Sequence, residues 1–260
     1  MKEYGTPEKP NAGARTVHNY IMIGAGGTGS HLARPLHTYL TSFHKGDEWI
    51  LHIVDGDVVE EKNLERQAFR PGTVTMNKAK ALALMLADET HIKAYSEYVS
   101  EENIGRFVRN GDTVFICADN FTVRARIEQT ARATDNVTVI NGGNEKWDGS
   151  VQLWVREKGK DVTPRIGYLH PEIAVGMGDD RAEMTCVQAA QLPGGEQTLI
   201  ANLTSATWML TALWRRHANG HVLSRKQEPG PQTWTEVQFD SLHGTVEHID
   251  QRMSAHWRTA

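Results

Sequence analysis

A glycine-rich stretch directly after a short apolar run limits the possible folds of this chain more than any other feature. Residues 20–23 read YIMI, typical of a buried strand, and residues 24–29 read GAGGTG. A helix-prone segment follows over residues 27–43. This order predicts the first unit of a doubly wound α/β fold, in which a helix N-terminus faces an anion such as a phosphate. The candidate phosphate-binding residues are Gly24, Gly26, Gly27 and Gly29.

The glycine pattern alone is a weak signal, because a glycine turn can also serve only to pack a helix against a strand. A second apolar run, residues 49–54, strengthens it, since that run ends at Asp55, with Asp57 two residues later. In such folds a carboxylate at the end of the second strand accepts hydrogen bonds from ribose hydroxyls. Asp57 alone would read as a solvated loop residue. Together with Asp55, the glycine turn predicts a nucleotide site.

Lys78 stands at an unusual place in the predicted structure. Residues 75–88 are rich in alanine and leucine and predict a helix, with Lys78 in its first turn. The helix dipole favours cations at the opposite end. A bound anion would offset this placement, although a single exposed lysine is usually only solvated.

The next segments predict further strands and helices of the same sheet. Strands are expected over residues 92–96, 112–118, 137–141 and 151–155, and helices over residues 101–108 and 121–134. The strand at 112–118 leads into Asp119 and Asn120, so a second acid lies at the carboxyl end of the sheet, where such folds bind ligands. Arg124 lies one to two helical turns from Asp119.

The C-terminal part is less regular. Residues 157–185 lack apolar periodicity and are expected to form a long crossover-type loop. Residues 196–217 carry the apolar stripes of a helix that Gly220 should stop, and residues 234–239 alternate like an edge strand. The expected fold is α/β: a Rossmann-like, doubly wound, mainly parallel sheet with antiparallel strands added toward the C-terminus.

The composition narrows the class of protein. The 260 residues suffice for one large α/β domain, and a net charge of −4 with mixed signs gives no reason to expect nucleic acid or a membrane as partner. Without a secretory signal or a long apolar span, Cys117 and Cys186 are expected to be free thiols in a cytoplasmic protein. The sequence contains no Cys-x-x-Cys pair, so no zinc site is expected. The spacing of the twelve histidines does not suggest a metal cluster either.

The combined motifs resemble the ThiF/MoeB/HesA family, the bacterial relatives of ubiquitin-activating enzymes. The family pattern is G-x-G-G-x-G, then D-x-D-x-V-x-x-x-N-L-x-R-Q, then a lysine, then D-N at the end of a later strand. The second element spans residues 55–67 here, with Asn63, Leu64, Arg66 and Gln67 in place. At this distance from the D-x-D, the N-L-x-R-Q element is highly specific. The resemblance covers residues 18–156 well and the helix after Glu196 loosely.

The resemblance implies an ATP-dependent adenylyltransferase that uses Mg²⁺. Such an enzyme activates the C-terminal carboxylate of a small ubiquitin-like or sulfur-carrier protein and is usually a homodimer. The implied catalytic residues are Arg66, Lys78 and Asp119, with the two cations on the phosphates and Asp119 on Mg²⁺ or on the reacting phosphate. The implied nucleotide-binding residues are Gly24, Gly26, Gly27, Gly29, Asp55, Asp57, Asn63 and Gln67.

We also expect the chain to divide into four segments. Residues 1–16 would be a mobile arm, residues 17–156 the nucleotide-binding adenylation core, residues 157–185 the loop, and residues 186–260 the helix and edge strands that complete the same domain. Two features depart from the family. This chain lacks the two Cys-x-x-Cys pairs that hold structural zinc in many members. The arginine often supplied by the partner subunit has only one candidate in the N-terminal arm, Arg15.

Cys186 is a candidate nucleophile that would accept the activated acyl group as a thioester. A thiol at a helix N-terminus can have a lowered pKa, but Asp179, Asp180 and Glu183 lie nearby and oppose thiolate formation. We therefore expect adenylation alone, with Cys186 incidental.

Two other functions remain open. An NAD(P)-dependent oxidoreductase would also use the glycine turn and Asp55, but it would leave Arg66, Lys78 and Asp119 unexplained. A non-catalytic module could keep the nucleotide pocket for regulation, although the intact catalytic set speaks against decay.

Overall fold

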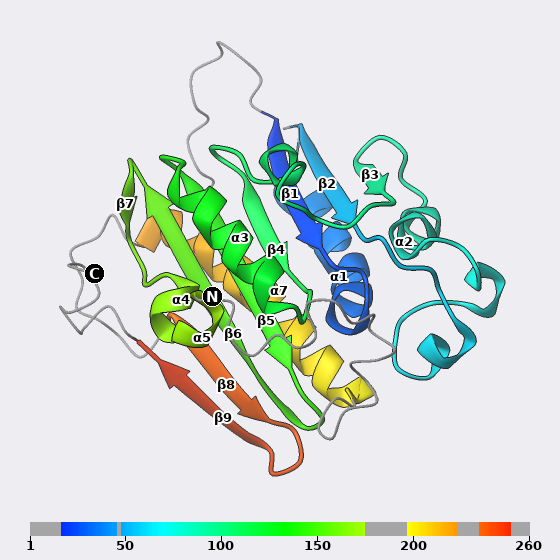
Figure 1. The fold of residues 1–260 in the computed structure, drawn as a ribbon. Coiled ribbons are helices and arrows are strands. Elements are labelled where there is room, and N and C mark those ends of the chain that lie inside the picture. Colours follow the sequence, from blue (N-terminus) through cyan, green and yellow to red (C-terminus); the bar gives the residue numbers. More distant parts are fainter. Residues whose placement is uncertain (1–16, 46–47, 175–196, 223–233, 251–260) are drawn as a thin grey trace.

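The computed structural model describes residues 17–45, 48–174, 197–222 and 234–250. In this part of the chain nine strands form one sheet, in the order β3-β2-β1-β4-β5-β6-β8-β9, with β7 paired to β6 (Figure 1). Strands β1 to β5 pair parallel to one another, and the later strands pair antiparallel. The predicted fold class is therefore confirmed.

The parallel strands are β1 (His18–Ile23), β2 (Trp49–Val54), β3 (Ile92–Tyr95), β4 (Thr113–Ile116) and β5 (Val137–Asn144). The antiparallel strands are β6 (Asp148–Glu157), β7 (Lys160–Asp161), β8 (Glu236–Asp240) and β9 (Thr245–Ile249). The helices are α1 (Gly27–Phe43), α2 (Lys78–Leu86), α3 (Phe121–Arg132), α4 (Ile166–Leu169), α5 (Pro171–Ala174) and α7 (Leu199–Val222). Short 3-10 turns are η1 (Glu61–Glu65), η2 (Pro71–Thr73) and η3 (Ile104–Arg106).

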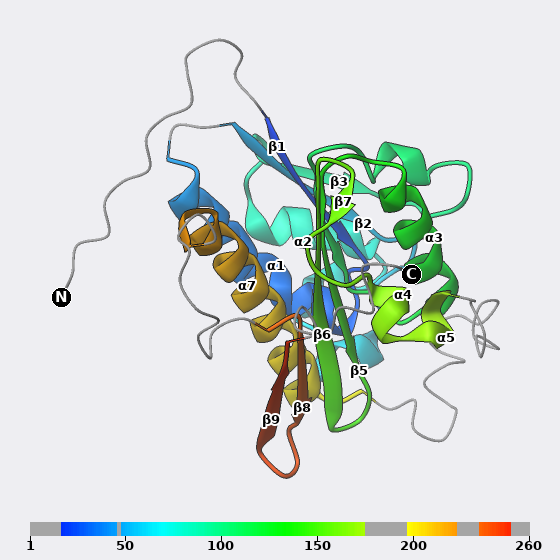
Figure 2. The ribbon, with the colours of Figure 1, turned by 90° about the vertical axis from the view of Figure 1, so that its left-hand side faces the viewer.

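Helices cover both faces of the sheet. With the sheet seen nearly edge-on, α1, α2 and α7 lie on one face and α3, α4 and α5 on the other (Figure 2). Strand β1 shows how the sequence produces two cores: Tyr20 and Met22 belong to the first apolar cluster, and Ile21 and Ile23 to the second. Successive side chains of a strand point to opposite faces, so a central strand must be apolar throughout.

The antiparallel half of the sheet has one apolar and one polar face. Val151 and Val237 join the same buried cluster as Met209 of α7. Gln152 of β6 and Glu236 of β8 are paired in register and are also buried, but they point to the opposite face. This polar face lies on the side of α4 and α5 (Figure 2).

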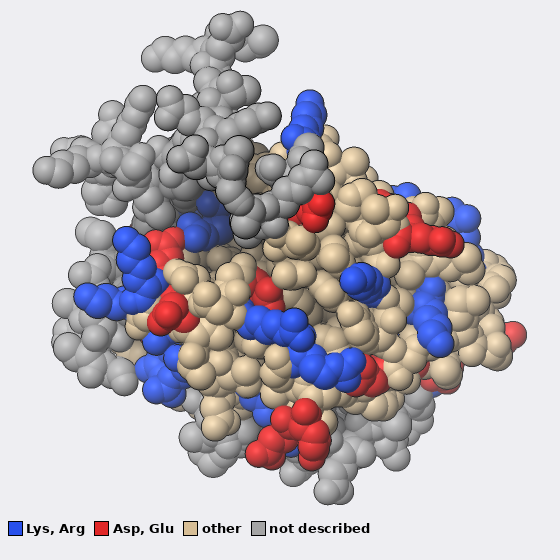
Figure 3. Space-filling view, turned by 90° about the horizontal axis from the view of Figure 1, so that it is seen from above, with Lys and Arg blue, Asp and Glu red and all other residues tan. Residues whose placement is uncertain are grey.

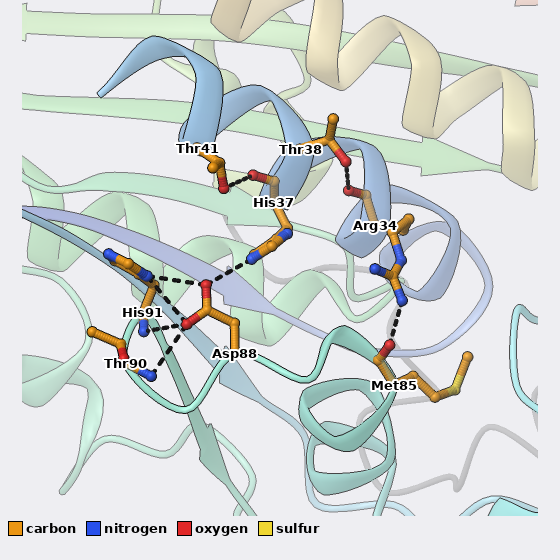
Figure 4. Close-up of polar contacts among 8 residues, drawn as sticks. All are labelled: Arg34, His37, Thr38, Thr41, Met85, Asp88, Thr90 and His91. Carbon is orange, nitrogen blue, oxygen red and sulfur yellow. Dashed lines mark hydrogen bonds and ion pairs between the residues drawn. The ribbon is translucent and has the colours of Figure 1, made fainter. Parts of the chain in front are cut away.

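One carboxylate ties α1 to the segment after α2. Asp88 Oδ2 lies 2.9 Å from Nε2 of His37, and its Oδ1 accepts a hydrogen bond from the backbone N–H of His91 at 3.1 Å (Figure 4). Burial opposes the charged form, but the hydrogen bonds from His37 and His91 outweigh it and lower the pKa of Asp88 to about 2. Nearby, Arg34 donates to the carbonyl of Met85. The two helices are thereby fixed to each other beside β2.

Two predicted segments differ in the structure. The helix expected over residues 101–108 is only the turn η3, because Asn103 donates through its side chain to the carbonyl of Tyr98 and so favours a turn over a helix. The segment expected to be a loop from residue 157 contains β7, α4 and α5, while residues 175–185 lie outside the described part. The elements in that segment are too short to produce apolar periodicity.

Two predictions at the C-terminal end were wrong. Helix α7 continues through Gly220 to Val222, since a glycine inside a helix lowers its stability without necessarily ending it. Strand β8 is not at the edge of the sheet, because β9 pairs with its outer side. The residues of β9 are mostly exposed, so its sequence carries no apolar alternation.

Charged residues of both signs are interspersed on the described surface at the end of the sheet where β1 and β2 begin (Figure 3). Among the helices that the structure describes, none combines the length and the apolar character needed to cross a membrane.

Candidate active site

The glycine turn, residues 24–29, is held between two central strands. Gly24 has a φ of +96°, a left-handed conformation that glycine adopts readily. Its N–H donates to the carbonyl of Val54 in β2 at 2.9 Å, and a Cβ on Gly24 would lie 2.8 Å from the backbone nitrogen of Ala118, just after β4. A Cβ on Gly29 would overlap the carbonyl oxygen of Gly24. Only glycine fits at these two positions.

Helix α1 begins within the glycine turn. No side chain caps its N-terminus, and its first turn contains no acidic residue. No residue of α1 itself therefore neutralises the positive end of its dipole, which suits an anion such as a phosphate.

Asp55 closes the glycine turn from the end of β2. Its Oδ2 accepts a hydrogen bond from the N–H of Ala25 at 2.6 Å, and its Oδ1 accepts one from the N–H of Asp57 at 2.8 Å. Burial raises the pKa of the Asp55 carboxyl, whereas the charge of Lys78 and the two backbone donors oppose that rise. The carboxylate thus lies where the sequence predicted it, against the glycine turn.

Lys78 is buried beside Asp57. Its Nζ lies 2.9 Å from Asp57 Oδ2, and its side chain is only 3% exposed. Tyr98 donates its hydroxyl hydrogen to the other oxygen of Asp57 at 2.5 Å. The side chain of Asn77, which caps α2, donates to the carbonyls of Asp55 and Asp57 at 2.8 and 2.9 Å. Hydrogen bonds and an ion pair therefore hold the start of α2, including Lys78, against the loop that contains Asp55 and Asp57.

Asn63 and Gln67 are both buried but differ in their contacts. Asn63 Oδ1 accepts a hydrogen bond from the N–H of Glu60 at 2.9 Å and so caps η1. Gln67 Nε2 lies 3.9 Å from the position that a Cβ of Gly26 would take. Within the described part of the chain, no hydrogen bond reaches the buried Oε1 of Gln67. An unsatisfied buried acceptor of this kind is unfavourable, and a bound donor would satisfy it.

The start of α7 covers the glycine turn. Arg66 Nη1 donates to Oε1 of Gln197 at 3.1 Å, and Asn202 donates to the carbonyl of Arg66 at 3.3 Å. Asn202 also accepts a hydrogen bond from Asn144 at 3.0 Å. A Cβ on Gly27 would lie 2.5 Å from the amide oxygens of both Gln197 and Asn202. These two amide groups therefore fill the space beside Gly27.

Asp119 and Arg124 border the site on the side of β4 and β5. Asp119 is exposed and follows Ala118, the residue in close contact with Gly24. Arg124 is buried; its Nε donates to the carbonyl of Ala118 at 3.2 Å and its Nη2 to that of Gly142 at 3.4 Å. Both residues line a groove of about 740 Å³ that extends over the polar face of the antiparallel strands.

The remaining predicted site residues, Cys186 and Arg15, lie outside the described residues. Cys117, the other cysteine, packs with its sulfur 4.0 Å from that of Met209, and burial raises the pKa of its thiol. Among the described residues, no group of three or more histidines, cysteines or acids could together hold a metal ion.

A glycine turn bordered by Asp55, Lys78 and Arg66 at the carboxyl end of a doubly wound sheet is typical of a nucleotide site. The family model described as the ThiF family matches residues 14–250. This chain belongs to the ThiF family. The expected family is thereby confirmed.

Several proteins resemble this member of the ThiF family. It is 29% identical over 139 residues to the SAMP-activating enzyme E1 of Haloferax volcanii, covering 52% of this chain and 48% of that protein. It is 27% identical over 138 residues to the adenylyltransferase and sulfurtransferase MOCS3 of Drosophila willistoni, covering 52% of this chain and 28% of that protein. The chain thus spans half or less of the length of these relatives.

Two crystal structures show the same fold. E. coli MccB with ATP superimposes with a TM-score of 0.60 at 18% identity, covering 90% of this chain and 63% of that one. Selenomethionine PaaA superimposes with a TM-score of 0.59 at 17% identity, covering 90% and 64%.

Sequence reasoning missed four residues that shape the site of this ThiF-family protein. Asn77 had a usable signal, since asparagine directly before a predicted helix is a preferred cap. Tyr98, Gln197 and Asn202 had none, because they reach their partners Asp57 and Arg66 across 41, 131 and 136 residues of chain.

Proposed function

We propose that this protein is an ATP-dependent adenylyltransferase. It would join AMP to the C-terminal carboxylate of a small ubiquitin-like or sulfur-carrier protein and release pyrophosphate. The observation that carries the proposal is a glycine turn bonded to Asp55, with Lys78 paired to Asp57 in the same loop and Arg66 bonded to Gln197 beside Gly27. The relatives support it, since they are named as an activating enzyme E1 and an adenylyltransferase, and MccB was crystallised with ATP.

The reaction needs positive charge at the phosphates. A carboxylate oxygen attacks the α-phosphorus of ATP, the bond from that phosphorus to the bridging oxygen breaks, and its electron pair leaves with pyrophosphate. Lys78 and Arg66 would stabilise the charge that builds on the phosphate oxygens, together with the N-terminus of α1. Asp55 would accept hydrogen bonds from the ribose hydroxyls.

The geometry fits ATP at three points. A Cβ at Gly26 would meet only Nε2 of Gln67, at 3.9 Å, so the turn is open to a nucleotide at that position. The unsatisfied Oε1 of Gln67 offers an acceptor to a donor of the nucleotide. Arg66 is held by the neutral amide of Gln197, which a phosphate would replace, because a charged acceptor forms the stronger hydrogen bond.

Asp119 is the proposed residue for Mg²⁺. Its exposed carboxylate follows Ala118, which contacts the glycine turn. One carboxylate is a sufficient protein ligand, since Mg²⁺ in nucleotide sites is usually held by one or two carboxylates, waters and the phosphates. When bound, Mg²⁺ would neutralise charge on the phosphates.

ATP–pyrophosphate exchange tests the proposal. The protein would be incubated with radiolabelled pyrophosphate, ATP, Mg²⁺ and small ubiquitin-like proteins that end in Gly-Gly. We expect Lys78→Ala and Asp119→Ala each to lower the exchange rate by roughly 10²–10³, the usual loss for a transition-state contact. Lys80→Ala is the matched control, because Lys80 is exposed on the same helix. Exchange at the wild-type rate in both site variants would exclude this assignment.

The non-catalytic alternative makes a different prediction in the same experiment. A regulatory module would bind ATP, as measured by calorimetry, and support no exchange with any carboxylate substrate. Binding without exchange would therefore favour the module over the enzyme.

We also propose that the enzyme is a homodimer in the cytoplasm and forms the adenylate without a thioester on Cys186. Four large apolar residues of α7 are at least 40% exposed, which supports a subunit interface on this helix: Leu199, Ile200, Leu203 and Trp214. A thiol-sensitive adduct on a non-reducing gel that disappears in Cys186→Ser, with exchange preserved, would refute the statement about Cys186.

A further inference from the structure

The groove beside Asp119 has a polar floor. It is built from one face of β5, β6, β8 and β9, since residues two apart on a strand share a face. Asp148, Ser150 and Gln152 alternate along β6, and the last two are paired in register with Gln238 and Glu236 of β8. All of them except Glu236 line the groove, which α3 and α5 border with Arg124 and Glu172. The groove therefore begins next to the proposed reaction centre and continues away from it.

The groove carries a strong excess of negative charge. Six of its lining side chains are carboxylates, against one guanidinium and one imidazole. Glu172 is paired with the imidazole of His170 at 3.1 Å and Asp240 with that of His243 at 2.6 Å, so these two carboxylates have local partners. The other four lining carboxylates are Asp119, Glu145, Asp148 and Glu247.

Several of these carboxylates have no local counterion. In the described part of the chain, no ion pair or hydrogen bond engages the side chains of Asp148 and Glu247. Arg124 donates to backbone carbonyls of β5 and of the segment after β4. A chain with a net charge of only −4 thus concentrates acidic side chains on the one polar surface that adjoins Asp119.

A second, independent observation is a buried acceptor in the groove that has no donor among the described residues. Asn141 lines it and is 1% exposed, and its Nδ2 donates to Gln152. Among the described residues, nothing donates a hydrogen bond to Oδ1 of Asn141. Buried acceptors are normally satisfied, so this oxygen calls for a donor from outside the described chain. Peptide N–H groups and cationic side chains are such donors.

We propose that this groove binds the segment that precedes the reacting carboxylate in the substrate, and that this segment carries arginine or lysine side chains. The proposal rests on the proposed adenylation, in which the carboxyl terminus of the substrate must reach the α-phosphate of ATP close to Asp119. Charge complementarity selects the partner, because placing like charges together at an interface is costly. The acidic groove would therefore accept a basic tail and reject an acidic one.

Peptide binding without ATP tests the proposal. The probes are two fluorescein-labelled synthetic peptides with free carboxyl termini that end in Gly-Gly. One carries arginines immediately before the Gly-Gly, and the other carries glutamates at the same positions. By fluorescence anisotropy with the full chain, we expect the arginine peptide to bind at least roughly tenfold more tightly. The preference should shrink between about 0.05 M and about 0.5 M salt, because salt screens exposed charges.

Charge variants test whether the groove residues cause the preference for the arginine peptide. Asp148→Lys combined with Glu247→Lys reverses two groove charges and should abolish the preference for the arginine peptide. Asp148→Asn combined with Glu247→Gln keeps the side-chain shapes and should reduce it. Glu89→Lys combined with Glu101→Lys changes the net charge as much as the lysine pair but at exposed sites outside the groove, and should retain the preference.

The outcomes are separable. Equal binding of the two peptides to the wild type, or a preference that survives in both groove variants, would overturn the proposal. A preference that the control pair also abolishes would mean that net charge alone is responsible, and would overturn it equally. The peptide-binding assay contains no ATP and is therefore independent of the pyrophosphate-exchange assay. If exchange fails while the arginine peptide is still preferred, only the proposed adenylation is refuted.

Discussion

At the scale of single residues, the glycine turn has no room for one extra methyl group. Gly29→Ala would place a Cβ against the carbonyl of Gly24, so we expect it to lower the free energy of unfolding by about 1–3 kcal/mol and to weaken ATP binding. Gly72→Ala is the control, because a Cβ at Gly72 meets nothing within 4 Å. Chemical denaturation and calorimetry measure both effects. A Gly29→Ala protein with the stability and ATP affinity of the wild type would show that the turn relaxes freely.

His217 predicts how stability depends on pH. Burial, together with the positive charges of neighbouring groups, lowers the pKa of His217 to about 3, and Tyr39 hydrogen-bonds to its Nδ1 at 2.8 Å. The ordinary pKa of histidine is about 6.5, so the unfolded state takes up this proton first as the pH falls. The contribution is complete above pH 6.5 and is lost progressively toward pH 3.

His217→Gln removes the titration and keeps a hydrogen-bonding side chain. Between pH 6.5 and pH 5, the free energy of unfolding of the wild type should fall by about 1–2 kcal/mol more than that of His217→Gln. Urea denaturation at each pH measures the difference. Parallel pH profiles for the two proteins would mean that His217 is not buried as a neutral ring.

The candidate site shows which residues a sequence can reveal. Gly24, Asp55 and Lys78 were predictable, because each follows or begins an element whose apolar pattern is clear. The sequence did not reveal that Lys78 is buried against Asp57, nor that Gln197 reaches Arg66. Such contacts depend on how distant elements pack, and no local pattern encodes them.

At the scale of elements, α7 joins three parts of the site through Asn202. Its side chain is buried and bonds to the carbonyl of Arg66 and to Asn144. Asn202→Leu preserves the volume but removes both hydrogen bonds, so that the carbonyl of Arg66 keeps only His31 and the side-chain nitrogen of Asn144 only the carbonyl of Glu145. This loss should lower the free energy of unfolding by about 1–3 kcal/mol. Thr207→Val on the same helix is the control, since the exposed Thr207 bonds only to the carbonyl of Leu203. Equal stability of the two variants would contradict a joining role for Asn202.

The elements themselves were predicted with uneven success for physical reasons. Helix α1 was predicted with its observed ends because it follows a glycine turn and carries a continuous apolar stripe. Strand β9 was missed because a mostly exposed strand needs no apolar alternation, and the short helices α4 and α5 were missed because each has only one turn. Tertiary packing decides such segments.

At the scale of the whole molecule, the outward side of α7 predicts a dimer. Ile200 and Trp214 are each 56% exposed, although large apolar side chains on one helix are normally covered. Light scattering at low micromolar concentration should return about twice the mass of the chain. Ile200→Glu combined with Leu203→Glu should return the mass of one chain, while Leu84→Glu, at an exposed apolar residue of α2, should leave the dimer intact. A wild-type monomer would refute the interface.

Gly24 is bonded to β2 on one side and touches the residues after β4 on the other, so the glycine turn cannot shift unless two central strands separate. A nucleotide would consequently meet a pre-formed surface, and its association would require no loop closure there. Any slow conformational step of a turnover would instead involve the more weakly fixed groups opposite the turn, such as the side chain of Gln197. Transient kinetics should therefore show rapid nucleotide capture followed by a slower rearrangement that substitutions of Gln197 alter and substitutions on the far side of the sheet do not.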